Sequence, residues 1–232
     1  MVLFTFYYNI FLMGSVTLLF HHVLKHFSVE TQLFDKYSVN MMRSLICGSI
    51  AHDAYIKYNY IWLDKCLENT IILHKFESFH YMFLAYFIFD TVILWYQVYI
   101  GIEKRIRMDL LLHHILAITS LLIIEEKKMY GITLMIGLSE GMSLVSGPKL
   151  LSMYYGNKYL TNIFIIYRLL YLIFIRMLFI WPSVIYFYYR ITNDCEKYKN
   201  DKNMFLVIFF VMIIFHAEIN WLHSGRKELA RI

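Results

Sequence analysis

The residues best suited to chemistry lie between Arg107 and Ala117, in the order Arg-Met-Asp-Leu-Leu-Leu-His-His-Ile-Leu-Ala. An imidazole can act as a general base near neutral pH or as a nucleophile, and a nearby carboxylate can orient it. His113 and His114 are therefore candidate catalytic residues. A metal site is the less favoured alternative, because adjacent histidines on a helix point about 100° apart and no repeated His box follows.

Further ionisable residues interrupt apolar segments of the chain. A charge at the centre of a membrane helix costs about 2.5–3.5 kcal/mol, so such groups usually face a bundle interior and find partners. Asp90 and Glu140 are candidate catalytic carboxylates. The candidate substrate-binding residues are His52, Arg168, His216, Asn220 and Asp109.

The spacing of these residues predicts that most of them meet in one layer. Gly137 and Gly141 bracket Glu140 on one helix face, a pattern of small residues that allows close helix approach, so Glu140 should face another helix. His216 and Asn220 share a stripe with His223. For His52, His216 and His223, packing or hydrogen bonding is favoured over catalysis. Arg176 and Glu218 are expected to be structural ion-pair members or to extend toward the interface.

The elements that must position these residues are long and apolar. The chain is 59% hydrophobic and 17% charged, whereas soluble domains have about 25% charged residues. About 20 apolar residues cross a bilayer as a helix. We therefore expect an all-α membrane protein with about seven transmembrane helices. The expected spans are Val2–Leu24, Met42–Leu63, Tyr81–Ile100, Leu110–Ile124, Met129–Val145, Leu160–Tyr189 with a bend at Pro182, and Met204–Leu222.

Basic residues in the loops predict the orientation. With seven spans, the side that holds the N-terminus has eight Lys and Arg residues and the other side has eleven, so the C-terminus is predicted to be cytosolic. A signal peptide is the alternative for the first span, but a basic n-region and a small-residue cleavage site are missing.

Cys47, Cys66 and Cys195 are far apart and predict neither a disulfide framework nor a metal site. The net charge is +5, and the basic residues lie beside apolar segments. This placement argues against nucleic-acid binding and favours contact with lipid headgroups.

The order of these features resembles the TLC (TRAM–LAG1–CLN8) domain. The resemblance rests on Asp109-x-x-x-His113-His114 with a downstream Glu140, and covers most of the chain. Its other elements are Arg43 and His52 in an early span, Asp90 in the next, Asn162 with Arg168, and Asn220-Trp221 near the end. It implies a TLC-type bundle with a central polar cavity over residues 41–226, an N-terminal helix and loop over 1–40, and a short cytosolic tail over 227–232.

The resemblance also implies two kinds of function. Ceramide synthases of this family join an acyl-CoA to a sphingoid amine in the endoplasmic reticulum. The His pair of these enzymes is implicated in acyl transfer. The resemblance implies that His113 or His114 would act in this step here, with Asp90 or Glu140 as the supporting carboxylate. Their second motif, His-Asp-x-x-Asp, is missing, since Leu138 to Ser143 contains one acid and no His. The chain thus looks more like the short TLC-domain proteins of lipid homeostasis, which would bind, sense or move a lipid.

The two functions share most of their expected partners. These are membrane lipids, including a sphingoid base or an acyl chain, and a homodimer remains open. No cofactor is expected, and acyl-CoA would be a co-substrate only in the enzyme. A multi-pass protein of the endoplasmic reticulum is implied by the family alone.

Overall fold

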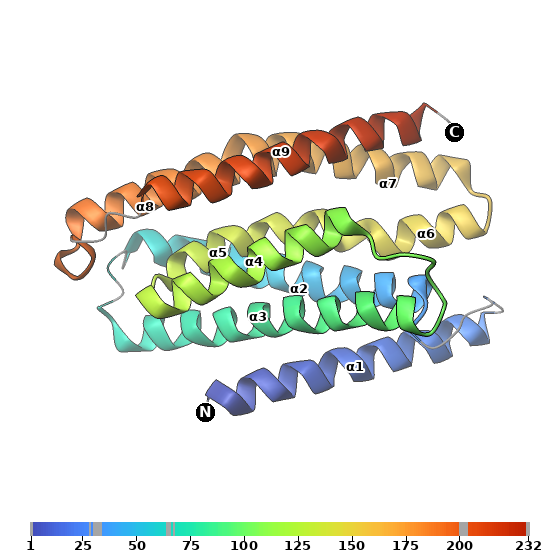
Figure 1. Ribbon diagram of the computed structural model, residues 1–232, viewed down its shortest axis with the longest axis horizontal. Coiled ribbons are helices and arrows are strands. Elements are labelled where there is room, and N and C mark those ends of the chain that lie inside the picture. Colours follow the sequence, from blue (N-terminus) through green and yellow to red (C-terminus); the bar gives the residue numbers. More distant parts are fainter. Residues whose placement is uncertain are drawn as a thin grey trace.

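The computed structural model describes residues 2–27, 29, 34–63, 66, 68–199 and 204–230, and these form an all-helical bundle without strands (Figure 1). Four rods are single helices beginning at the N-terminus: α1 (Val2–His26), α2 (Lys36–Leu63), α3 (Thr70–Tyr99) and α4 (Met108–Lys127). The next rod joins α5 (Tyr130–Ser139), a 3-10 segment (Glu140–Val145) and α6 (Ser146–Tyr154). The long sixth rod joins α7 (Lys158–Leu170), a π-helical segment (Tyr171–Ile180) and α8 (Trp181–Asp194). A short 3-10 turn (Glu196–Tyr198) then leads to α9 (Met204–Leu229).

Polar side chains fix several helix starts. The Asn69 carboxamide oxygen accepts hydrogen bonds from the backbone N–H groups of Ile71 and Ile72, and Asn157 caps α7 in the same way. The carboxylate of Asp35 accepts hydrogen bonds from two backbone N–H groups at the start of α2. These caps satisfy donors that have no partner inside a helix. The short links that they define reverse the chain between neighbouring rods.

Four of the helical rods are long and apolar enough to cross a membrane. They cover Thr70–Tyr99, Met108–Lys127, Lys158–Asp194 and Ile208–Leu229. These four correspond to the third, fourth, sixth and seventh expected spans, so the prediction of a helical membrane protein is confirmed. The other three expected spans are also helical but are not among the four.

The fifth expected span is not one regular helix. Its α-helical geometry ends at Ser139 and continues as the 3-10 segment that begins at Glu140. In the sixth expected span, the turns that precede Pro182 have π-helical geometry. Proline has no N–H to donate to the carbonyl four residues earlier, and π-helical turns frequently mark functional sites.

The core lies where α2, α3 and α5 pack together, and α1 covers its outer side (Figure 1). Phe79 and Phe83 of α3 are buried there. A Cβ atom on Gly137 would lie 2.6 Å from the Phe79 ring, and one on Gly141 would clash with Tyr171. The predicted close approach at these glycines is therefore confirmed. Glu140, between them, is buried at 4% exposure.

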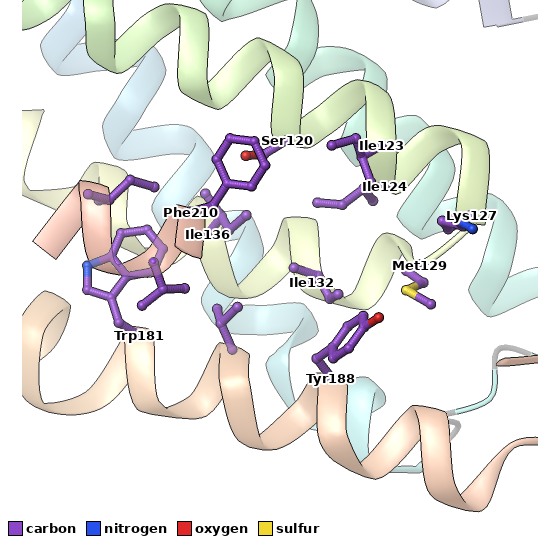
Figure 2. Close-up of a pocket in the computed structure, with 13 residues that line it drawn as sticks. Ser120, Ile123, Ile124, Lys127, Met129, Ile132, Ile136, Trp181, Tyr188 and Phe210 are labelled. Atoms are coloured by element: carbon purple, nitrogen blue, oxygen red, sulfur yellow. The ribbon is translucent and has the colours of Figure 1, made fainter. Parts of the chain in front are cut away.

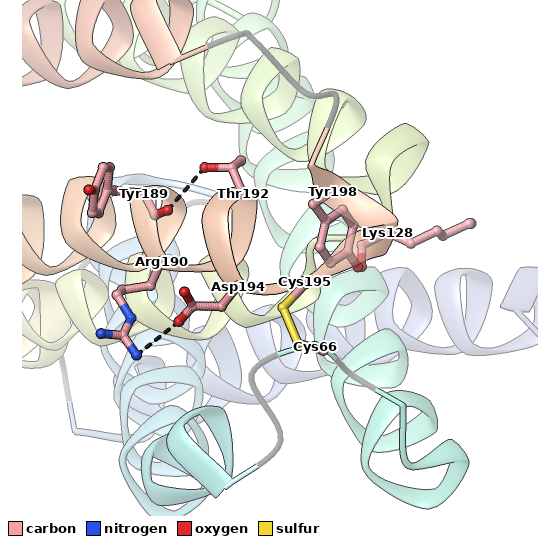
Figure 3. Close-up of a disulfide and its surroundings, with 8 residues drawn as sticks. All are labelled: Cys66, Lys128, Tyr189, Arg190, Thr192, Asp194, Cys195 and Tyr198. Atoms are coloured by element: carbon pink, nitrogen blue, oxygen red, sulfur yellow. Dashed lines mark hydrogen bonds and ion pairs between the residues drawn. A yellow bond between two sulfur atoms is a disulfide. The ribbon is translucent and has the colours of Figure 1, made fainter.

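A disulfide joins Cys66, before α3, to Cys195 at the end of α8 (Figure 3). The two cysteines are 129 residues apart in the chain, so their spacing in the sequence did not suggest the bond. The bond lies at the end of the bundle where α4 meets α5, since the Tyr198 hydroxyl donates a hydrogen bond to the Lys128 carbonyl oxygen.

Some residues used for the predicted orientation lie outside the described part of the chain. These are Lys65, Lys202 and Arg231, which were counted among the basic residues of the two sides. Positions 231–232 of the expected tail also lie outside it.

Candidate functional site

A cavity of about 470 Å³ lies toward the end of the bundle opposite the disulfide. Its wall is built from α2, α3, α4, the rod from α5 to α6, the rod from α7 to α8, and α9. The wall contains seven basic and five acidic side chains. Such a set is unusual between membrane helices, where charges are kept only with partners or for function.

Asp90 connects two basic side chains in the cavity wall. The Arg43 Nε donates hydrogen bonds to both Asp90 carboxylate oxygens, at 2.8 and 3.0 Å. His114 Nε2 lies 3.3 Å from Asp90 Oδ2. Asp90 is only 1% exposed, so this carboxylate has its partners inside the protein rather than in water. Three helices, α2, α3 and α4, are thereby linked by one charged group.

His114 is held at both ring nitrogens. Its Nδ1 lies 3.1 Å from the Thr91 hydroxyl oxygen. That hydroxyl also donates a hydrogen bond to the Phe87 carbonyl oxygen at 2.7 Å, and the tautomer of the His114 ring decides which atom donates between Thr91 and Nδ1. The other nitrogen faces Asp90. His114 therefore positions the network and has no free nitrogen for attack on a ligand.

His113 has a different environment. Its ring lies between Phe87 and Trp221, with centroid distances of 5.7 and 5.3 Å, and it lines the cavity. Within the described part of the chain, neither ring nitrogen of His113 has a hydrogen-bond partner. Of the two histidines, His113 is thus the one whose nitrogen is available to a ligand.

Glu140 lies in the deeper part of the cavity wall. Its carboxylate contacts the Cys47 thiol, with Sγ 3.7 Å from Oε2, and the Ser139 hydroxyl, 3.5 Å from Oε1. It thus faces α2, as its bracketing glycines predicted. These contacts are long and neutral, so the Glu140 charge has no close cation within the described residues.

Arg176 extends from the π-helical segment and is 2% exposed. Its Nε lies 2.8 Å from Glu218 Oε1, and its guanidinium stacks 5.5 Å from the Trp221 ring centroid. Its Nη2 is buried and has no hydrogen-bond partner among the described residues. Arg176 and Glu218 thus form an ion pair with each other, which is one of the two roles expected for them, and the Arg176 side chain also lines the cavity.

The mouth of the cavity carries further charges. Lys149 pairs with Glu228 at 2.7 Å, and burial, together with the nearby Arg168, lowers the pKa of Lys149. Arg107 pairs with Asp109 at 2.7 Å in an exposed position. Arg168 has no ion pair or hydrogen bond in the described part of the molecule. Glu228, the carboxylate whose charge acts on the Arg168 guanidinium, is shared with Lys149, so this end of the cavity holds more positive than negative charge.

Six of the nine predicted site residues line this cavity: His113, His114, Asp90, Glu140, Arg168 and Asp109. The expected placement of the other three is wrong. His52, His216 and Asn220 are exposed and do not line it.

The register of α9 explains the error for two of these residues. This helix turns Glu218, Trp221 and Glu228 inward, at spacings of three and seven, and the competing stripe of His216, Asn220 and His223 lies on the outside. Lys149 of α6 and Glu228 of α9 also line the cavity and were not predicted as binding residues. For Glu228 the signal was the inward register of α9.

No group of three or more His, Cys, Asp or Glu side chains in the described residues is placed to hold a metal ion. No family model, curated protein or solved structure matches this chain.

The buried network predicts a large stability cost for the variant Asp90→Asn. This change leaves the Arg43 guanidinium, which is 12% exposed, without its carboxylate, and such losses cost about 3–5 kcal/mol. Asp109→Asn is the matched control, since its ion pair is exposed and should contribute less than about 1 kcal/mol. Unfolding of the detergent-solubilised chain, followed by circular dichroism, measures both. Equal stability of the two variants would contradict the role of Asp90.

Proposed function

We propose that this protein binds a membrane lipid with an anionic headgroup in the cavity of its helical bundle, as a TLC-type protein of lipid homeostasis. The observation that carries the proposal is the Arg176 guanidinium, which is buried in the cavity wall with an unsatisfied Nη2. A buried donor without a partner costs about 1–3 kcal/mol. A phosphate or carboxylate oxygen of a ligand would supply that partner.

The charge of the wall supports the same class of ligand. Arg168 has no close ion pair within the described residues, and the carboxylates of Asp90 and Glu228 are already paired with Arg43 and Lys149. Glu140 is a wall carboxylate without a close cation among the described residues, but basic side chains outnumber acidic ones in the wall by seven to five, so its net charge favours an anion. Binding, sensing or moving a lipid would each use such a site.

Lipid analysis of the purified chain tests this proposal. We expect an anionic lipid to co-purify in a mild detergent, and Arg168→Gln to reduce its amount about tenfold, because a charge-assisted hydrogen bond contributes about 1.5–3 kcal/mol. Lys104→Gln is the control, since Lys104 is exposed in the loop at the same end of the bundle and does not line the cavity. Mass spectrometry of bound lipid is the measurement. No enriched species, or equal loss in both variants, would overturn the proposal.

We infer in addition that all seven helical rods cross the membrane, with the disulfide end outside the cytosol. Disulfides persist in oxidising compartments, and Cys66 and Cys195 form one. The Lys and Arg count of the loops independently predicts the same orientation. The cavity mouth and the C-terminal end of α9 would then face the cytosol. Residence in the endoplasmic reticulum agrees with this arrangement.

Labelling of sealed endoplasmic-reticulum vesicles with a membrane-impermeant maleimide tests the orientation. Lys104→Cys, near the cavity mouth, should react in intact vesicles. Glu126→Cys, an exposed position near the disulfide end, should react only after detergent permeabilisation. A reversed pattern would place the cavity mouth in the lumen.

Acyl transfer is the second candidate function, favoured by the free ring of His113 beside the Arg43–Asp90–His114 network. A ring nitrogen of His113 would attack the thioester carbonyl of an acyl-CoA. The carbon–sulfur bond would break, and the thiolate would leave with the imidazole proton. A sphingoid amine would then attack the acyl-imidazole, form the amide and return a proton to His113. His114 and Asp90 would act as positioning residues, and the buried Glu140 would be a second carboxylate near the reaction.

Purified protein with acyl-CoA and a panel of sphingoid bases tests this candidate. We expect amide product from the unmodified chain and at least about a 100-fold lower rate from His113→Ala, because the attacking group is removed. His52→Ala is the matched control, since His52 is exposed outside the cavity. Amide formation measured by mass spectrometry decides the outcome. If no amine yields a product, the acyl-transfer mechanism is excluded, while lipid binding is tested separately.

A further inference from the structure

The outer face of α2 carries polar side chains at the depth of the membrane interior. Both α2 and α3 pack against α5 and run in the same direction through the bundle as the other rods (Figure 1), and α3 is long and apolar enough to cross a membrane. The 28 residues of α2 form a helix about 42 Å long. His52 lies about 4 Å from its midpoint and Asn59 about 14 Å from it. Both depths fall within the half-thickness of the hydrocarbon layer, which is about 15 Å.

The exposed residues on this face follow a heptad pattern. Successive spacings of four, three, four and three residues separate Leu45, Ser49, His52, Ile56 and Asn59, and each of these five residues is exposed. An average spacing of 3.5 residues is the period at which two helices pack along each other as a left-handed coiled coil. We call these five residues the α2 seam.

The α2 seam contains hydrogen-bonding groups that have no partner in the described part of the chain. These groups are the His52 imidazole and the Asn59 carboxamide. The Ser49 hydroxyl donates a hydrogen bond to the Leu45 carbonyl oxygen at 2.8 Å, and its small side chain allows another helix to approach closely. Lipid chains have no hydrogen-bonding groups, so lipid against this seam would leave His52 and Asn59 unsatisfied. In membranes such side chains hydrogen-bond across helices.

The α2 seam is self-complementary, which favours a second copy of this chain as its partner. Around a two-fold axis along the membrane normal, two α2 helices run parallel and each seam residue faces its own counterpart. A neutral imidazole and a carboxamide each have both a donor and an acceptor, so His52 and Asn59 can each pair with their counterparts. Beside the seam, Lys57 and Asp53 form an ion pair at 2.6 Å within the helix. Their charges therefore compensate each other in each copy, and two like charges do not meet unpaired.

We propose that two copies of this chain associate in the membrane through the α2 seam, as a parallel pair of α2 helices. The inference rests on α2 crossing the membrane with the other rods, and it does not depend on the ligand of the cavity. The cavity-lining residues of α2 are Lys36, Asn40 and Arg43. At about 100° per residue, they lie on the opposite side of the helix from the seam. Each copy therefore keeps its own cavity.

Oxidative crosslinking of the full chain in phosphatidylcholine vesicles tests the seam. We expect Ile56→Cys to form a disulfide-linked dimer on a non-reducing gel, with at least about a fivefold higher yield than Ile115→Cys, because a two-fold axis brings position 56 against its own counterpart. Ile115→Cys is the matched control, since Ile56 and Ile115 are 55% and 50% exposed and Ile115 belongs to α4. The unmodified chain, whose free Cys47 is buried, gives the background. Equal yields from the two variants, or no dimer with Ile56→Cys, would refute the seam.

The polar seam residues are tested by light scattering of the chain in a mild detergent. We expect the mass of two chains, and His52→Leu and Asn59→Leu should each weaken the dimer about three- to thirtyfold, corresponding to about 0.6–2 kcal/mol for one hydrogen bond between helices. Both positions are exposed, so each copy should keep its fold, which circular dichroism checks. Arg168→Gln should leave the dimer unchanged, which separates this proposal from that of the cavity ligand. An unaltered dimer in the double variant of His52→Leu and Asn59→Leu would overturn the proposal, as would a monomeric chain that crosslinks through Ile56→Cys only to a different protein.

Discussion

The arrangement of this bundle follows from the cost of placing charges among apolar helices. An ionised side chain taken out of water needs a partner of opposite charge and further hydrogen bonds. Asp90 meets this requirement with Arg43 and His114, so α2, α3 and α4 are brought to one position. Glu218 does the same with Arg176 and Trp181 between the sixth rod and α9. The helices that carry functional groups are thus also the helices that the charges hold together.

Much of the fold could be predicted from the sequence, because apolar segments and the polar residues that separate them are local features of the chain. The helices α4 and α9 lie close to their expected spans, whereas α3 begins at Thr70, well before the expected Tyr81. The small residues Gly137 and Gly141 indicated where helices approach. Departures from α-helical geometry were harder to predict. The 3-10 segment that begins at Glu140 depends on how the α5–α6 rod packs against its neighbours, which no local pattern records.

The candidate site could be predicted only where the sequence shows which face of a helix turns toward the bundle interior. His113 and His114 project to different surroundings because they are about 100° apart on α4, and only the structure tells that His114 is fully engaged. The helix α9 has two polar faces, one with Glu218 and one with His216. Hydropathy does not show which of them faces the bundle interior. The disulfide of Cys66 and Cys195 could not be predicted, since a separation of 129 residues leaves their distance in space undetermined.

The same charged partners divide the interior into two chemically different halves. On the cavity side, Arg168 has no close ion pair within the described residues and Arg176 has an unsatisfied Nη2. Beyond Glu218, the hollow between α4, α5, α8 and α9 is lined mostly by apolar side chains (Figure 2). Trp181 belongs to both halves, because its ring lines this hollow while its N–H binds Glu218. A ligand that crossed from one half to the other would have to replace that hydrogen bond and the Arg176 ion pair together. These contacts therefore separate a charged half of the interior from an apolar half.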